Sequence, residues 1–168
     1  ETRTERYLST WKRGLMPDPA KRLIAAQAVF KSRDATALPA LEGALAKETE
    51  ARVKKVMLEA RAAIILTQPS SKDVDKVEAI AVIRERSDQD ARGLLGSLPA
   101  DLPATVQRTA ADAIATIDQY LARWQMVQQV YQSIWANKNQ SDSEQPAENA
   151  LAVVQGIWNR YDTEFQQK

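Results

Sequence analysis

The side chains of this sequence that could do chemistry are carboxylates, amines, guanidiniums and hydroxyls, because histidine and cysteine are both absent. Without an imidazole or a thiol, the chain lacks the usual general base at neutral pH, the imidazole metal ligands and the thiolate nucleophile. Paired carboxylates remain, but most acidic residues fall at predicted helix starts, where capping and the helix dipole account for them. We therefore expect no catalytic residue, no cofactor and no metal site. We also expect no carboxylate isolated on an apolar face, where burial would raise its pKa.

Two short motifs could bind anions, and both are better explained as parts of helices. The segment "RGLLGSLP" at 92–99 carries two glycines at a spacing of three, but it lacks the Lys-Ser/Thr pair and the preceding strand of a phosphate-binding loop. The basic run "ARVKKVMLEAR" at 51–61 interleaves an apolar stripe with charged residues. The spacing of Lys55 and Glu59 is typical of a solvated helix face, and we interpret the run in that way.

Aromatic residues near the C-terminus form the only other candidate surface. Trp124, Tyr131 and Trp135 lie along one predicted helix, and Trp158 lies along the next. The first interpretation is a shared hydrophobic seam between the two helices. The alternative is an interaction surface made by Trp124, Tyr131, Trp135 and Trp158, which would dock on a partner or lie at a membrane interface.

Composition indicates which elements must position these residues. The chain has 168 residues, only 5 of them glycine, and residues that favour helices dominate, which predicts an all-α fold. Its 23 basic and 22 acidic residues are interspersed and give a net charge of +1, so nucleic acid is not expected as a partner. No stretch approaches the ~18 apolar residues of a membrane span. The start "ETRTERYL" has neither an initiator Met nor an apolar signal region, which predicts that the chain is a fragment.

The first half of the chain reads as a series of amphipathic helices. Residues 1–16 show a helical stripe, which ends before Pro17. Asp18 and Pro19 predict the start of a second helix, and Asp34 predicts the cap of a short third helix over about 36–47. A longer helix over 50–67 follows. Its predicted buried residues, at helical spacing, are Val53, Val56, Met57, Ala60 and Ile64.

The same order of elements then recurs. Asp73 or Asp75 is expected to cap the next helix, Asp88 or Asp90 a short one over 89–98, and a long helix begins near residue 104. A shift of 53 or 54 residues superimposes the two halves, including the aspartates at 34 and 88. This predicts a HEAT-like α-solenoid of two three-helix repeats, 18–66 and 72–117. The alternative is a chance likeness between amphipathic helices rich in alanine and leucine.

The remaining segments complete the predicted organisation. The long helix is expected to run over about 104–135, with its apolar residues at alternating steps of four and three. Residues 1–135 would then form the helical-repeat domain, 136–145 a polar loop, and 146–168 a C-terminal amphipathic helix within the same overall domain. Because that helix repeats the same spacing, we expect it to pack back against the long helix as an antiparallel pair.

Four stretches of the sequence resemble a known family. They are "DPAKRLIAAQAVFKSRDATALPALEGALAKE" at 18–48, "ARAAIIL" at 60–66, "RSDQDARGLLGSLP" at 86–99 and "AADAIATIDQYLARWQMVQ" at 110–128. In this order they resemble the extracytoplasmic helical-repeat region of the permease subunit of bacterial urea ABC transporters, relatives of the branched-chain amino-acid permeases. The likeness covers about residues 17–135.

The resemblance implies a non-catalytic, soluble domain at the periplasmic face of the inner membrane, which serves docking or assembly of a urea-type importer. Its partners would be other transporter subunits, and it would meet the membrane only through a membrane domain that is missing here. No small-molecule site can be identified. After a position like Trp135 the family continues into an apolar span, whereas this chain continues with "ANKNQSDSEQPAENA". The alternative is a stand-alone scaffold that binds another protein through a concave side built by 36–47 and 89–98.

Overall fold

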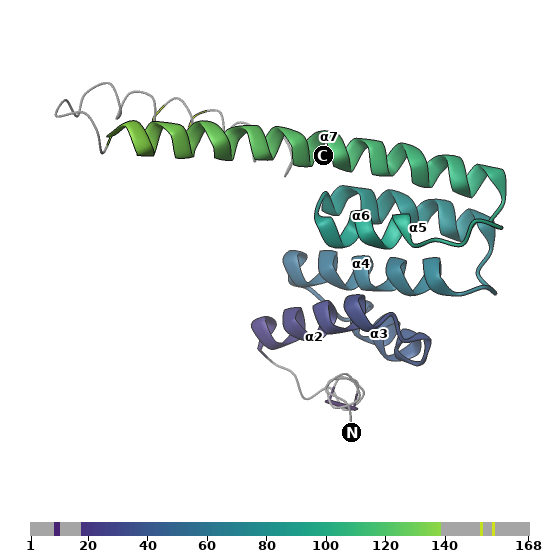
Figure 1. Cartoon of the computed structure of the whole chain (residues 1–168). Coiled ribbons are helices and arrows are strands. Elements are labelled where there is room, and N and C mark those ends of the chain that lie inside the picture. Colours follow the sequence, from purple (N-terminus) through teal and green to yellow (C-terminus); the bar gives the residue numbers. More distant parts are fainter. Residues whose placement is uncertain (1–8, 11–17, 139–151, 153–155, 157–168) are drawn as a thin grey trace. The chain divides into compact units, whose positions relative to one another are not determined.

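The computed structural model describes residues 9–10, 18–138, 152 and 156, and every regular element in these residues is helical. The elements are α2 (Pro19–Ser32), the 3-10 turn η1 (Ala35–Ala37), α3 (Leu38–Leu45), α4 (Ala51–Thr67), α5 (Asp73–Arg86), α6 (Gln89–Gly96) and α7 (Ala104–Lys138) (Figure 1). The predicted all-α class is therefore confirmed. The chain divides into two compact units, residues 1–117 and 118–168. The predicted helix over 1–16 and the predicted C-terminal helix over 146–168 lie almost wholly outside the described residues.

The N-terminal ends of the helices follow from local capping. The Asp18 carboxylate accepts a hydrogen bond from the backbone N–H of Ala20 at 2.9 Å, and Pro19 occupies the first position of α2, as predicted. Asp34 accepts from the N–H of Thr36 at 2.9 Å and caps η1, which leads directly into α3. Asp88 accepts from the N–H of Ala91 at 2.8 Å and caps α6.

The cap of α5 differs from the prediction. Its N-cap residue is Lys72, whose side chain makes no capping bond, while Asp73 and Asp75 lie inside the first turn. Their negative charges still favour the helix, since they lie at the positive end of its dipole. Sequence spacing alone could not separate a capping aspartate from a first-turn aspartate, because both positions favour that residue type.

The chain contains two comparable trios of helices. The first trio covers residues 19–67, with α2, η1, α3 and α4, and the second covers residues 73–138, with α5, α6 and α7. Helices α2 and α5 each have 14 residues and begin 54 positions apart, at 19 and 73. Helices α4 and α7 begin 53 positions apart, at 51 and 104. Both α2 and α5 end at a residue in the left-handed conformation, Arg33 (φ 52°) and Ser87 (φ 51°), which are the two such non-glycine residues in the described part of the chain. The predicted offset is therefore found at the starts of these two pairs of helices, whereas α3 and α6 begin 51 positions apart, at 38 and 89.

The buried residues recur with the same offset. The first trio buries Ala25, Val29, Ala37, Leu41, Val53, Ala60 and Ile64, and the second buries Ala79, Ile83, Ala91, Leu95, Val106, Ala113 and Ile117. Each residue of the second group lies 53 or 54 positions after its counterpart. Of the residues predicted to be buried in the helix over 50–67, Val53, Met57, Ala60 and Ile64 are in the core, whereas Val56 is half-buried.

Helix α4 is the central element of the described core, because it packs against both α2 and α5 (Figure 1). It is consequently buried on two faces: one contains Ala60 and Ile64, the other Glu59, Ala62 and Ala63. The corresponding second face of α7 is different. The residues 53 positions later are Asp112, Ala115 and Thr116, and all three are exposed.

Two glycines lie inside short helices with nothing near the place of a side chain. A Cβ atom added at Gly43 in α3 or at Gly93 in α6 would meet no atom within 4 Å. Glycine inside a helix costs about 0.5–1 kcal/mol relative to alanine, so Gly43→Ala and Gly93→Ala should each raise the free energy of unfolding by that amount. Urea denaturation measures the change. Since the two sites lie in different helices, the double variant should show the sum, and a loss of stability in either single variant would contradict the open surroundings.

Candidate functional site

The structure describes the side chains of two residues of the predicted aromatic surface, Trp124 and Tyr131. Trp124 is half-buried on α7 and Tyr131 is 44% exposed on the same helix. They lie seven positions apart, which is two turns, so they share a face of α7. The backbone at Trp135 belongs to α7, and its side chain, like all of Trp158, lies outside the described part of the structure. The interaction surface therefore stays a prediction.

The two anion motifs are helical, as expected. Gly93 and Gly96 belong to α6, and the C=O of Gly93 accepts a bond from the N–H of Ser97 at 3.1 Å. In the basic run, Arg52 and Lys55 are exposed. The expectation of a solvated face is wrong for one residue of that run, however, because Glu59 is only 5% exposed.

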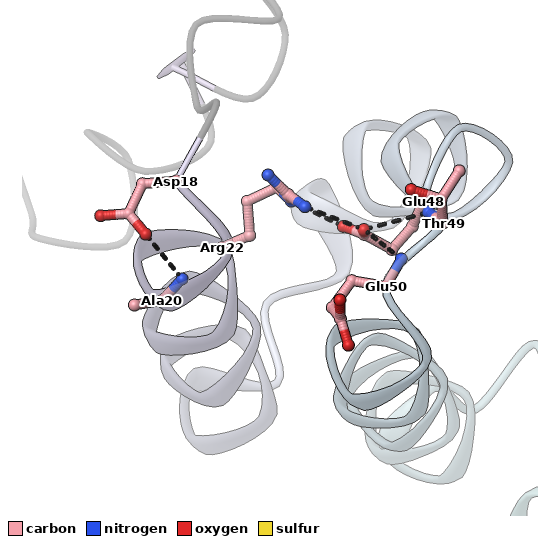
Figure 2. Close-up of polar contacts among 6 residues, drawn as sticks. All are labelled: Asp18, Ala20, Arg22, Glu48, Thr49 and Glu50. Carbon is pink, nitrogen blue, oxygen red and sulfur yellow. Dashed lines mark hydrogen bonds and ion pairs between the residues drawn. The ribbon is translucent and has the colours of Figure 1, made fainter.

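The structure instead forms two partly buried ion pairs, which are the candidate site. In the first, Arg22 of α2 holds Glu48 at the entry to α4 with two hydrogen bonds, from Nε at 2.7 Å and from Nη2 at 3.0 Å (Figure 2). The Glu48 side chain is 2% exposed. Its Oε1 also accepts from the backbone N–H groups of Thr49 and Glu50 at 3.1 and 2.9 Å. Glu48 thus satisfies donors at the start of α4 and fixes α2 there.

The hydrogen bond from Arg22 lowers the pKa of Glu48, and the bond from the N–H of Glu50 adds to this effect against the cost of burial. A lowered pKa in the folded state means that Glu48 stabilises the fold above its unfolded pKa of about 4.3. This contribution is lost as the pH falls through the folded value.

We therefore expect Glu48→Gln to lower the free energy of unfolding at pH 7 by about 1.5–3 kcal/mol, the range for hydrogen bonds to charged groups. At pH 2.5 the difference from the unmodified chain should shrink, because Glu48 is then protonated in the unfolded chain and its ionised form stabilises the fold less. Urea titrations at both pH values measure this. Equal losses at the two pH values would contradict the role of the ionised carboxylate.

The second ion pair is built around Arg86, the last residue of α5. Its Nη1 donates to Glu59 Oε2 of α4 at 2.7 Å. Its Nε lies 2.7 Å from Asp88 Oδ2, and its Nη2 lies 3.9 Å from Asp90 Oδ2. Its guanidinium carbon lies 4.3 Å from the ring centroid of Phe30 of α2, a cation–π contact. We call Glu59, Arg86, Asp88, Asp90 and Phe30 the Arg86 cluster.

Asp88 has two roles in the Arg86 cluster. Its Oδ1 caps α6, and its Oδ2 faces the Arg86 guanidinium. The contact with Nε is an ion pair without hydrogen-bond geometry, because this buried nitrogen has no hydrogen-bond partner despite the short distance. The guanidinium is thus held by charge on this side and by a directed hydrogen bond to Glu59 on the other.

Burial raises the pKa of Glu59, and the favourable charges of Arg86 and Lys55 only partly oppose this. The expectation that no carboxylate would be raised by burial is therefore wrong. The error has a physical source: "AAIIL" at 62–66 is apolar on every side, which indicates a helix buried on two faces, and Glu59 lies one turn earlier on the second of these faces. The apolar run at 62–66 is therefore the feature of the sequence that indicates the burial of Glu59.

The chemistry of both ion pairs is structural: each joins helices that are distant in sequence. Among the described residues, no group of three or more carboxylates is placed to hold a metal ion. No helix in the described ranges is long and apolar enough to cross a membrane. Comparison of the chain with protein-family models, with curated proteins and with solved structures finds no match.

Proposed function

We propose that the chain is a non-catalytic HEAT-like repeat domain, an α-solenoid of two three-helix repeats, that docks other proteins. The observation that carries this proposal is an offset of 53–54 residues. It is shared by the starts of α2 and α5 and of α4 and α7, the left-handed residues Arg33 and Ser87, the capping residues Asp34 and Asp88, and the buried positions. Stacked helical repeats offer extended surfaces, and proteins of this architecture use them to bind partners.

We further propose that the partners are subunits of a urea-type ABC importer, at the periplasmic face of the inner membrane. The support is the resemblance of the sequence over about residues 17–135. In this role the chain assists assembly, and the translocation path and ATP hydrolysis belong to other polypeptides.

Binding of the purified chain to a purified urea-binding periplasmic subunit, and to the membrane domain of a urea-type permease in detergent, tests this role. Biolayer interferometry with the chain immobilised measures both. Saturable binding to either subunit supports the proposal. Absence of binding to both contradicts the transport role.

The second candidate is a stand-alone scaffold that uses the exposed sides of α3 and α6. It is favoured by the open surroundings of Gly43, Gly93 and Gly96, which leave backbone accessible to another molecule. Gly93→Arg adds a long side chain on this surface without a clash inside the chain. Gly93→Arg should abolish partner binding. The matched variant Ala81→Arg, at an exposed position of α5, should leave partner binding unchanged. Loss of binding in both variants, or in neither, would contradict the use of this surface.

We also propose, from the sequence spacing, that the C-terminal segment 146–168 forms a helix that packs back on the long helix. Trp158→Ala should then lower the melting temperature, since truncating a buried tryptophan costs about 3–5 kcal/mol. If melting is unchanged and the variant instead loses dimers in sedimentation or binding to liposomes, the intramolecular pairing is wrong.

A further inference from the structure

The Arg86 cluster differs from the Arg22–Glu48 pair in what it connects. Arg22 and Glu48 both belong to the first trio. Arg86 belongs to the second trio, yet its hydrogen-bonded carboxylate, Glu59, and its aromatic contact, Phe30, both belong to the first. The other two carboxylates near the Arg86 guanidinium, those of Asp88 and Asp90, lie in the second trio at the start of α6. One guanidinium is therefore shared between the two trios.

We propose that the Arg86 cluster is a pH-sensitive junction: Glu59 takes up a proton as the solution is acidified, and Arg86 then releases α4 while it stays at the start of α6. The charge balance in the cluster supports this. With Glu59 ionised, carboxylates on both sides attract the guanidinium. With Glu59 neutral, the remaining ionic attraction comes from Asp88 and Asp90, and the cation–π contact with Phe30 is the one attraction left from the first trio within the cluster. Lys55 on α4, which acts electrostatically on Glu59, then adds repulsion from the α4 side.

Glu59 is the group in the cluster suited to be the proton acceptor. It is 5% exposed, whereas the side chains of Asp88 and Asp90 are 40% and 53% exposed. Burial disfavours the ionised form of a carboxylate, and its pKa is raised accordingly. A carboxyl group whose pKa is raised by folding stabilises the folded chain below its unfolded pKa, and this stabilisation is lost as the pH rises through the folded value. Protonation of Glu59 therefore does not unfold the chain. It weakens only the ion pair between Glu59 and Arg86.

Nitrogen-15 NMR of the Arg86 side chain in the full chain tests the junction. The Nη1–H group of Arg86 reports on it directly, since it donates to Glu59 Oε2 on α4 at 2.7 Å. A carbon-13 titration of the Glu59 carboxyl first locates its midpoint. We expect a midpoint above about 4.3 and a fall of about tenfold in the protection of the Arg86 Nη1–H group against solvent exchange as the pH drops through it. Urea titrations at one pH above the Glu59 midpoint and one below it separate local opening from global unfolding.

Two isosteric variants sharpen the experiment. Glu59→Gln mimics the protonated state, so the protection of the Arg86 Nη1–H group should already be low at pH 7 in this variant and should not change with pH. Glu48→Gln alters the matched Arg–Glu pair inside the first trio and should keep the pH step. A Glu59 midpoint at or below 4.3, unchanged protection across the midpoint, or a pH step that persists in Glu59→Gln would overturn the proposal.

Discussion

Arg86→Ala is expected to lower the free energy of unfolding at pH 7 by about 3–5 kcal/mol, the range for removal of one partner from a buried ion pair. The size follows from what remains: Glu59 stays buried on α4 with no guanidinium to accept from, and Phe30 loses its cation. The side chains of Arg86 and Glu59 are 17% and 6% exposed, so water cannot readily replace the lost contacts. Urea denaturation followed by circular dichroism measures the loss.

The double variant Glu59→Leu with Arg86→Met is the matched control. It removes both charges and keeps similar volumes, and buried ion pairs replaced in this way are often neutral or more stable. We therefore expect it to regain most of the stability that Arg86→Ala loses. If the double variant is as unstable as Arg86→Ala, the loss comes from packing around the Arg86 stem and not from an unpaired carboxylate.

Ile64→Ala and Ile117→Ala are expected to lower the free energy of unfolding by about 2–5 kcal/mol each, because both side chains are fully buried and the truncation leaves a cavity. The two residues lie 53 positions apart at corresponding places in α4 and α7. If the trios are equivalent units, the two losses should be similar. Thermal and urea unfolding of the two single variants measures them.

Ile24→Ala provides the control for this pair, since Ile24 is 48% exposed on α2. Its truncation should cost less than about 1 kcal/mol, because surface substitutions rarely exceed that value. A large loss of unfolding free energy at Ile117 together with a small loss at Ile64, or the reverse, would show that these two positions are not equivalent in the two trios.

The helices and most of their caps could be predicted from the sequence because their causes are local. Asp18 with Pro19 marks the start of α2, and Asp34 and Asp88 mark the turns after two helices of equal length. Each signal depends on residues within one turn of helix. The core positions followed in the same way from spacings of three and four.

The candidate site could not be predicted because its partners are distant in sequence. Arg22 and Glu48 are 26 residues apart, and Arg86 and Glu59 are 27 apart. Spacing on a single helix placed Glu59 with Lys55 on a polar face, and only the packing of α5 against α4 shows that this face is covered. The apolar run at 62–66 is a local sign that Glu59 is covered, but no local rule identifies Arg86, 27 residues away, as its partner.

The exposed second face of α7 limits how far the stack of helices can grow. On α4 the positions of Glu59, Ala62 and Ala63 are covered, whereas on α7 the positions of Asp112, Ala115 and Thr116 lie in water. A copy stacked there would have to strip water from the Asp112 carboxylate, which is costly unless a cation pairs with it. Open-ended, head-to-tail interfaces build filaments, and an exposed polar helix face works against them as charged side chains do at the edge of a β-sheet. Asp112 and Thr116 thus disfavour head-to-tail association through this face.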